Sequence, residues 1–152
     1  FFRPTGIYIF EKKCMYINDK SNICEVLTPK DILYFLLVKP SFGVSTKNAF
    51  EKLDCINHKN ASPQPLLDAL QYFSQDVGKY LYNCFIQTDS RLITEYISGI
   101  QLAKKIGFDG FSMTGTGSCF FAVTTDKQIL TNGYKYFHSK YPFIAKTSLQ
   151  LL

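Results

Sequence analysis

The chain has 152 residues, of which 46% are hydrophobic, and its formal net charge is +5. This length fits one domain with a hydrophobic core, and the composition is typical of a folded globular protein rather than a disordered one. The longest apolar run, ILYFLLV, is too short to cross a bilayer, and the scattered lysines form no basic stripe, so neither a membrane nor a nucleic acid is expected as a partner.

The cysteines and histidines show no pattern typical of a metal site. The five cysteines are far apart, without a C-x-x-C pair, and neither of the two histidines lies near a pair of cysteines. No metal-binding residues are therefore predicted, and the cysteines are expected to be reduced thiols in a reducing compartment.

The first elements expected along the chain are β-strands. Residues 6–19 predict a hairpin, because two aromatic and β-branched runs flank a charged turn. Residues 31–40 predict a nearly continuous apolar strand of the kind that is covered on both faces. Pro40 and Gly43 end this strand.

A helical region follows. Ser45 or Thr46 is the expected N-cap of a helix that ends near Asp54. The polar residues 55–65, with two prolines, predict a loop. Two more helices are expected after it, at residues 66–73 and 77–86.

The clearest predicted helix begins at Asp89 or Ser90, because its apolar residues recur at steps of three and four. Gly107 follows it as a C′ glycine would. Short β-prone runs at residues 108–113 and 119–124 then flank a glycine-containing loop.

The last part of the chain predicts a weaker helix over residues 126–141, interrupted by Gly133, and a closing strand over residues 142–152. Adjacent hairpins together with helices favour an α+β fold, in which one antiparallel sheet is flanked by helices. Since there is no repeat or linker, residues 1–152 are expected to form a single domain.

The glycine loop lies in the segment MTGTGSCFFA. It is not a Walker A loop, and it is not the dinucleotide fingerprint, because Phe120 stands where a third glycine is needed. Glycines let a backbone approach a ligand, exposed N–H groups can bind an anion, and hydroxyls add donors. A tight structural turn is the alternative interpretation. The candidate phosphate-binding residues are Thr114, Gly115, Thr116, Gly117 and Ser118.

A second motif, KPSFGVSTKNAF, carries a strand into a helix whose start holds Ser45, Thr46 and Lys47. Helix N-termini attract anions, so this segment is a candidate binding site. The alternative is an ordinary capped helix.

In this order and spacing, the two motifs resemble the C-terminal half of the GHMP kinases. PSFGVSTKNAF is similar to the P-x-x-x-V-S-T-x-x-A-(F/Y) segment of those members that act on 4-diphosphocytidyl-2-C-methyl-D-erythritol. MTGTGSCFFA is similar to their M-(S/T)-G-(S/T)-G-(S/A)-C-x-F-A loop, and FIAKTSL resembles their closing strand. Asn83 falls where they show Asn-Asp-Leu-Glu, a pattern from which this chain departs at Cys84. The resemblance covers most of the chain.

The resemblance implies an ATP-dependent kinase that uses Mg2+ and phosphorylates the 2-hydroxyl of this cytidyl-diphosphate sugar alcohol in non-mevalonate isoprenoid biosynthesis. It also implies that this chain is the C-terminal substrate-binding domain and begins just after the catalytic Asp of the family. The catalytic Asp and the main ATP site would then belong to an N-terminal domain of the same parent, and the chain alone would be inactive, with no catalytic residue of its own. A bacterial cytoplasm or a plastid-type stroma is the expected location.

By the same resemblance, Phe50 stacks on the cytosine ring while Thr46 and Ser45 border its pocket. Lys47 is a candidate partner of the substrate diphosphate by charge and location, and a core position is the alternative for Phe50.

Two other functions stay open. A GHMP kinase for homoserine or mevalonate would share the glycine loop without needing a base-stacking Phe50, and a non-catalytic α+β binding module would need neither. Domain faces exposed in the isolated chain favour a homodimer.

Overall fold

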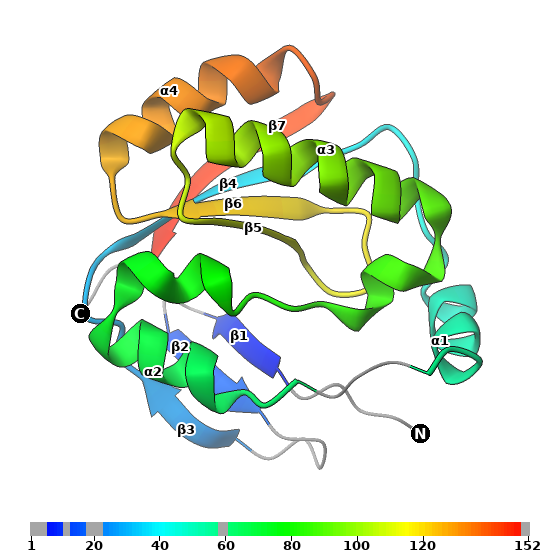
Figure 1. Ribbon diagram of the computed structural model, residues 1–152, viewed down its shortest axis with the longest axis horizontal. Coiled ribbons are helices and arrows are strands. Elements are labelled where there is room, and N and C mark those ends of the chain that lie inside the picture. The colour runs from blue at the N-terminus through cyan, green and yellow to red at the C-terminus, as the bar shows by residue number, and fades with distance from the viewer. Residues whose placement is uncertain (1–5, 11–12, 18–22, 58–60, 150–152) are drawn as a thin grey trace.

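The computed structural model describes residues 6–10, 13–17, 23–57 and 61–149 (Figure 1). Within them, the strands form two antiparallel sheets, of three and four strands. The first sheet has the order β1-β2-β3, with β1 at Gly6–Phe10, β2 at Lys13–Ile17 and β3 at Ile23–Leu27. The second has the order β5-β6-β4-β7, with β4 at Leu33–Lys39, β5 at Gly110–Met113, β6 at Phe120–Thr124 and β7 at Phe143–Leu149.

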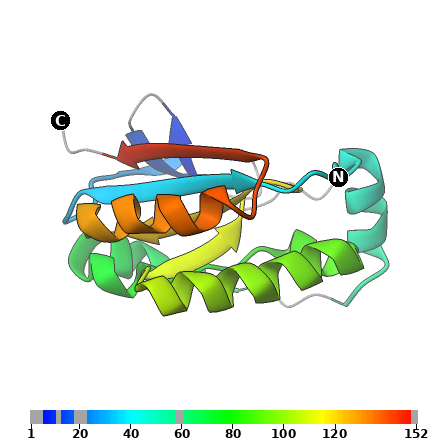
Figure 2. The same ribbon diagram turned by 90° about the horizontal axis from the view of Figure 1, so that it is seen from above.

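Helices cover both sheets. The α-helices are α1 at Thr46–Asp54, α2 at Gln64–Tyr72, α3 at Ser90–Ile106 and α4 at Lys127–His138. Two short 3-10 helices lie between α2 and α3, η1 at Ser74–Lys79 and η2 at Cys84–Thr88. Figure 2 shows α3 and α4 along one face of the four-stranded sheet. The predicted α+β class with antiparallel pairing is confirmed.

The four-stranded sheet has a hydrophobic cluster on each face because side chains alternate along its strands. Leu36 and Val38 of β4 pack into the cluster shared with α3 and α4. Leu33 packs into a second cluster, with Leu70 of α2 and Leu27 of β3. The expectation that this strand is covered on both faces is confirmed.

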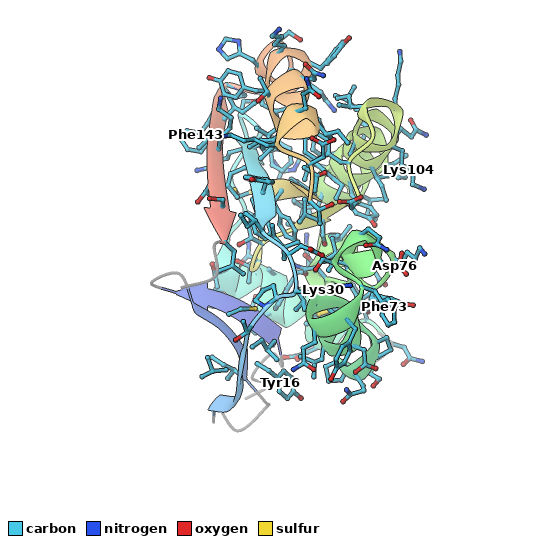
Figure 3. The ribbon with its side chains drawn as sticks, turned by 90° about the vertical axis from the view of Figure 1, so that its left-hand side faces the viewer. Tyr16, Lys30, Phe73, Asp76, Lys104 and Phe143 are labelled. Carbon is cyan, nitrogen blue, oxygen red and sulfur yellow. The ribbon has the colours of Figure 1, made fainter. Side chains whose placement is uncertain are left out.

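The linker between β3 and β4 ties α2 and η1 to the sheets. The Lys30 N–H donates to the carbonyl of Leu70 at 2.9 Å, and the Asp31 N–H donates to Oγ of Ser74 at 3.3 Å. Figure 3 shows Lys30 beside the segment that carries Phe73 and Asp76. Pro29, in this linker, separates β3 from β4, so the strands form two sheets where the sequence predicted one.

Most predicted elements agree with the structure. The 6–19 hairpin is present as β1 and β2, apart from residues 11–12 and 18–19, which lie outside the described residues. In α3, the Asp89 carboxylate caps the first turn by accepting the Arg91 N–H at 2.9 Å, and Gly107 ends the helix with φ 104°. Strand β3 was not predicted.

The predicted helix over residues 77–86 is wrong. The chain there forms η1, an irregular stretch and η2, because Gly78 lies directly against β5. A Cβ on Gly78 would lie 1.6 Å from the Asp109 carbonyl oxygen, so the backbone follows this contact instead of a helical path.

Two helix boundaries also differ from the prediction. Helix α2 begins at Gln64, inside the predicted loop, because Pro65 is tolerated in a first helical turn. Gly133 lies within α4 and does not interrupt it. Its missing side chain makes room for the ring of Phe108, which would lie 2.3 Å from a Cβ there.

None of the helices in the described part of the chain is long and apolar enough to cross a membrane.

Candidate functional site

The two sequence motifs meet at one end of the four-stranded sheet. Strands β4 and β6 are antiparallel neighbours, and Val38 lies opposite Phe120. The segment that leaves β4 toward α1 and the glycine loop that enters β6 therefore lie at the same end of the sheet (Figure 1).

Side chains of the glycine loop contact the incoming segment directly. The Ser118 hydroxyl donates to the Phe42 carbonyl at 2.5 Å. The hydroxyls of Thr46 and Thr116 lie 3.2 Å apart, within hydrogen-bonding distance. The structure thus brings together candidate residues that are 70 positions apart in the sequence.

The glycine loop is closed by two hydrogen bonds of its own backbone. The Thr114 N–H donates to the Cys119 carbonyl at 2.9 Å, and the Gly117 N–H donates to the Thr114 carbonyl at 3.2 Å. Gly115 and Gly117 have φ values of 56° and 93°, a region that favours glycine. A tight turn and a ligand-binding loop would both need these residues.

The polar groups of the glycine loop differ in how accessible they are to a ligand. Among the described residues, no protein acceptor faces the backbone N–H groups of Gly115 and Thr116. Gly115 and Thr114 are exposed, and Thr116 is half-buried. Ser118 is buried, and its hydroxyl is used by Phe42, so it holds the loop in place rather than facing a ligand. The free N–H groups suit an anion.

At the start of α1, Ser45 has a structural role. Its Oγ accepts the Asn48 N–H at 3.4 Å and caps the helix, as predicted. Lys47 lies 3.9 Å from Glu51, one turn along, and both side chains are largely exposed. Such a pair contributes little, so the Lys47 ammonium can turn toward an anion at small cost.

Phe50 is half-buried on the next turn of α1. Its ring lies edge-to-face against Phe85 of η2, with the centroids 4.9 Å apart. Part of the ring therefore packs against the protein, and part is open to a flat ligand. The core and stacking interpretations of Phe50 are both compatible with this position.

A small cleft of about 140 Å3 lies between α1 and the start of α3. Asp89 and Arg91 line it, and the Arg91 side chain donates to the Asp89 carboxylate at 2.7 Å. Chiefly through this hydrogen bond, the pKa of Asp89 falls to about 2, which keeps the carboxylate ionised. The Arg91 guanidinium also lies 4.8 Å from the ring centre of Phe42. Phe42 is therefore contacted both by α3, through Arg91, and by the glycine loop, through Ser118.

Comparison with known proteins adds relatives and solved structures. A Francisella tularensis protein named 4-diphosphocytidyl-2-C-methyl-D-erythritol kinase is 33% identical over 131 residues, which is 83% of this chain and 41% of that protein. A Streptococcus mutans protein, assigned provisionally to the same kinase, is 30% identical over 119 residues, or 76% of this chain and 42% of its own length. No family profile matches the chain.

Three of the similar solved structures are kinases. A crystal structure of 4-(cytidine 5'-diphospho)-2C-methyl-D-erythritol kinase has a TM-score of 0.69 at 14% identity, and the match covers 90% of this chain and 49% of that one. Leishmania (L. major) mevalonate kinase with R-mevalonate has a TM-score of 0.63 at 16% identity, covering 91% and 48% of the two chains. In sequence and in fold, the chain is similar to the GHMP kinases. It spans less than half the length of the curated relatives that it matches.

Three residues at the site were not predicted from the sequence: Asn83, Arg91 and Phe42. Asn83 donates to two carbonyls of the glycine loop, and Arg91 and Phe42 pack together beside the loop. The resemblance to the GHMP kinases marked the place of Asn83 but gave it no role. No sequence signal links Arg91 with Phe42, because their contact arises only when α3 folds against the segment after β4.

Proposed function

We propose that residues 1–152 are the C-terminal, substrate-binding domain of a two-domain, ATP-dependent kinase. The parent phosphorylates the 2-hydroxyl of 4-diphosphocytidyl-2-C-methyl-D-erythritol, a step of non-mevalonate isoprenoid biosynthesis. The observation that carries this proposal is the direct contact of the two motifs, through Thr46 with Thr116 and Ser118 with Phe42. The names of relatives that are 33% and 30% identical support the same substrate.

The proposed chemistry assigns positioning roles to this domain. Phosphoryl transfer depends on alignment and charge stabilisation rather than on covalent protein chemistry. The open N–H groups of Gly115 and Thr116 are suited to a phosphate oxygen, with the hydroxyl of Thr114 as a further donor. The open part of the Phe50 ring receives the cytosine, and Lys47 is available to the substrate diphosphate.

Mg2+ and ATP belong to the other part of the parent in this proposal. Among the residues that the structure describes, no three His, Cys, Asp or Glu side chains gather in a group suited to a metal ion. In this proposal, the residues of this domain act on the acceptor and the transferred phosphate. The catalytic base is assigned to the N-terminal domain.

The experiment is an ADP-release assay on the full-length parent with Mg-ATP and three separate acceptors. Turnover is expected with the cytidyl-diphosphate sugar alcohol, and none with homoserine or mevalonate. Cytidine diphosphate is expected to compete with the acceptor. Turnover with homoserine or mevalonate instead would assign the parent to another branch of the GHMP kinases and leave Phe50 as a packing residue. No turnover with any acceptor would favour the non-catalytic binding module.

A further inference from the structure

Asn83 connects the glycine loop with η2. Its Nδ2 donates to the Met113 carbonyl at 2.8 Å and to the Gly115 carbonyl at 2.9 Å. Its Oδ1 accepts the Phe85 N–H at 2.9 Å. Because two acceptors face one side of the amide and a donor faces the other, these partners fix its orientation.

The two carbonyls that Asn83 binds flank Thr114, where β5 turns into the loop. The loop's own hydrogen bonds join Thr114 with Cys119 and with Gly117. They leave the Gly115 carbonyl unheld, and a Cβ on Gly115 would meet nothing within 4 Å. Asn83 is therefore the contact that sets the direction of the Gly115 peptide within the described residues.

The segment that holds Asn83 and Phe85 also contacts α1, the candidate substrate-binding helix. Phe85, whose N–H is held by Asn83, packs its ring against Phe50 of α1. One short segment thus touches both halves of the proposed site, the loop through Asn83 and α1 through Phe85.

We propose that Asn83 is a positioning residue for phosphoryl transfer, which holds the glycine loop in the shape that binds the transferred phosphate and sets it against the Phe50 helix. This inference rests on the proposed function. It gives Asn83 no contact with the substrate, since both of its amide hydrogens are occupied by loop carbonyls.

The deciding variant is Asn83→Asp in the full-length kinase. It retains the side-chain shape and the oxygen that accepts the Phe85 N–H, but it turns a carboxylate oxygen toward two carbonyls. At pH 8 we expect kcat to fall by about 10- to 100-fold with little change in KM for the acceptor, because the loop is misplaced while the acceptor pocket stays intact.

The pH dependence distinguishes positioning from a general loss of folding. Two facing carbonyl oxygens raise the pKa of a carboxyl group, so the new Asp side chain takes up a proton as the pH falls and regains one donor. The ratio of variant to wild-type kcat is therefore expected to rise between pH 8 and pH 5.5. The titratable groups with shifted pKa values on this segment and on the loop are Tyr82, Cys84 and Cys119. Burial is the main cause that raises the pKa of each, so all three stay neutral throughout this range.

The matched control is Asn132→Asp, the same change on the exposed surface of α4, which is expected to leave kcat and its pH profile as in the wild type. Hydrogen exchange of the peptide covering residues 111–121 gives a readout without any acceptor, and faster exchange is expected in the Asn83→Asp protein at pH 8. Wild-type kcat, or a deficit equal at every pH, overturns the proposal. If wild-type enzyme turns over no acceptor, the proposed function fails, while unchanged exchange in the variant overturns the role of Asn83 separately.

Discussion

At the scale of single residues, Phe50 carries both a packing contact and the proposed cytosine contact. Phe50→Leu keeps an apolar side chain against Phe85 but removes the flat ring. Since stacking of a base on an aromatic ring contributes about 1–3 kcal/mol, KM for the cytidyl acceptor is expected to rise about tenfold with kcat nearly unchanged. Steady-state kinetics of the full-length enzyme measure both constants. Phe143→Leu, at an exposed position on β7, is the control, and an unchanged KM in Phe50→Leu would assign Phe50 to packing alone.

Three glycines near the site differ in what an added methyl group would meet. Gly117→Ala combines a φ of 93° with a Cβ 2.7 Å from the Met113 sulfur, so it is expected to destabilise the fold most. Gly115→Ala meets open space at a φ of 56°, and a loss of about 1 kcal/mol is expected. Gly43→Ala has neither constraint and should be neutral or slightly stabilising. Urea unfolding gives the order, and equal losses at the three positions would contradict the loop geometry.

At the scale of elements, the start of α3 should show a pH-dependent contribution to stability. The hydrogen bond from Arg91 lowers the pKa of Asp89 from 3.8 to about 2. A lowered pKa in the folded state means that the contribution is complete above about pH 4 and is lost as the pH falls toward 2. Asp89→Asn keeps a good N-cap but removes the charge. The free energy of unfolding of this variant should be lower than wild type at pH 7, and the difference should shrink at pH 2.5. A difference that persists unchanged at pH 2.5 would show that the ion pair is not its cause.

The elements that the sequence predicted correctly are those with local signals. The ends of α3 follow from Asp89 and Gly107, which act within one turn of the helix. The helix expected over residues 77–86 fails because Gly78 packs on β5, a contact between residues distant in sequence. The prediction that Gly133 interrupts its helix is wrong for a similar reason, because only the fold places the Phe108 ring against Gly133.

At the site too, residues with local sequence signals were predictable, and residues that act through distant contacts were not. The glycine loop and the capped start of α1 were predictable because their glycines, hydroxyls and cap lie in short motifs. Asn83 was not, because its partners Met113 and Gly115 are 30 and 32 positions away and no property of an isolated Asn identifies them. The contact of Ser118 with Phe42, 76 positions apart, likewise depends on β4 pairing with β6.

At the scale of the whole molecule, the four-stranded sheet joins the two hydrophobic clusters. Ala122 of β6 lies in the cluster covered by α3 and α4, and its neighbour Val123 lies in the cluster covered by α2 and the three-stranded sheet. The three-stranded sheet therefore shares its core with β6 and is expected to unfold together with the rest of the protein.

Cys14, on β2, reports on this coupling. Its side chain is 2% exposed within the second cluster, and burial raises the pKa of its thiol to about 11, so both access and thiolate formation oppose alkylation. Under native conditions the exposed Cys55 should react with iodoacetamide while Cys14 does not. Peptide mass spectrometry across a urea titration should show Cys14 becoming reactive in the same transition as the change in tyrosine fluorescence. Alkylation of Cys14 at lower urea would mean that the three-stranded sheet opens separately, and that the cluster that Cys14 shares with Leu33 and Val123 is too weak to couple the two sheets.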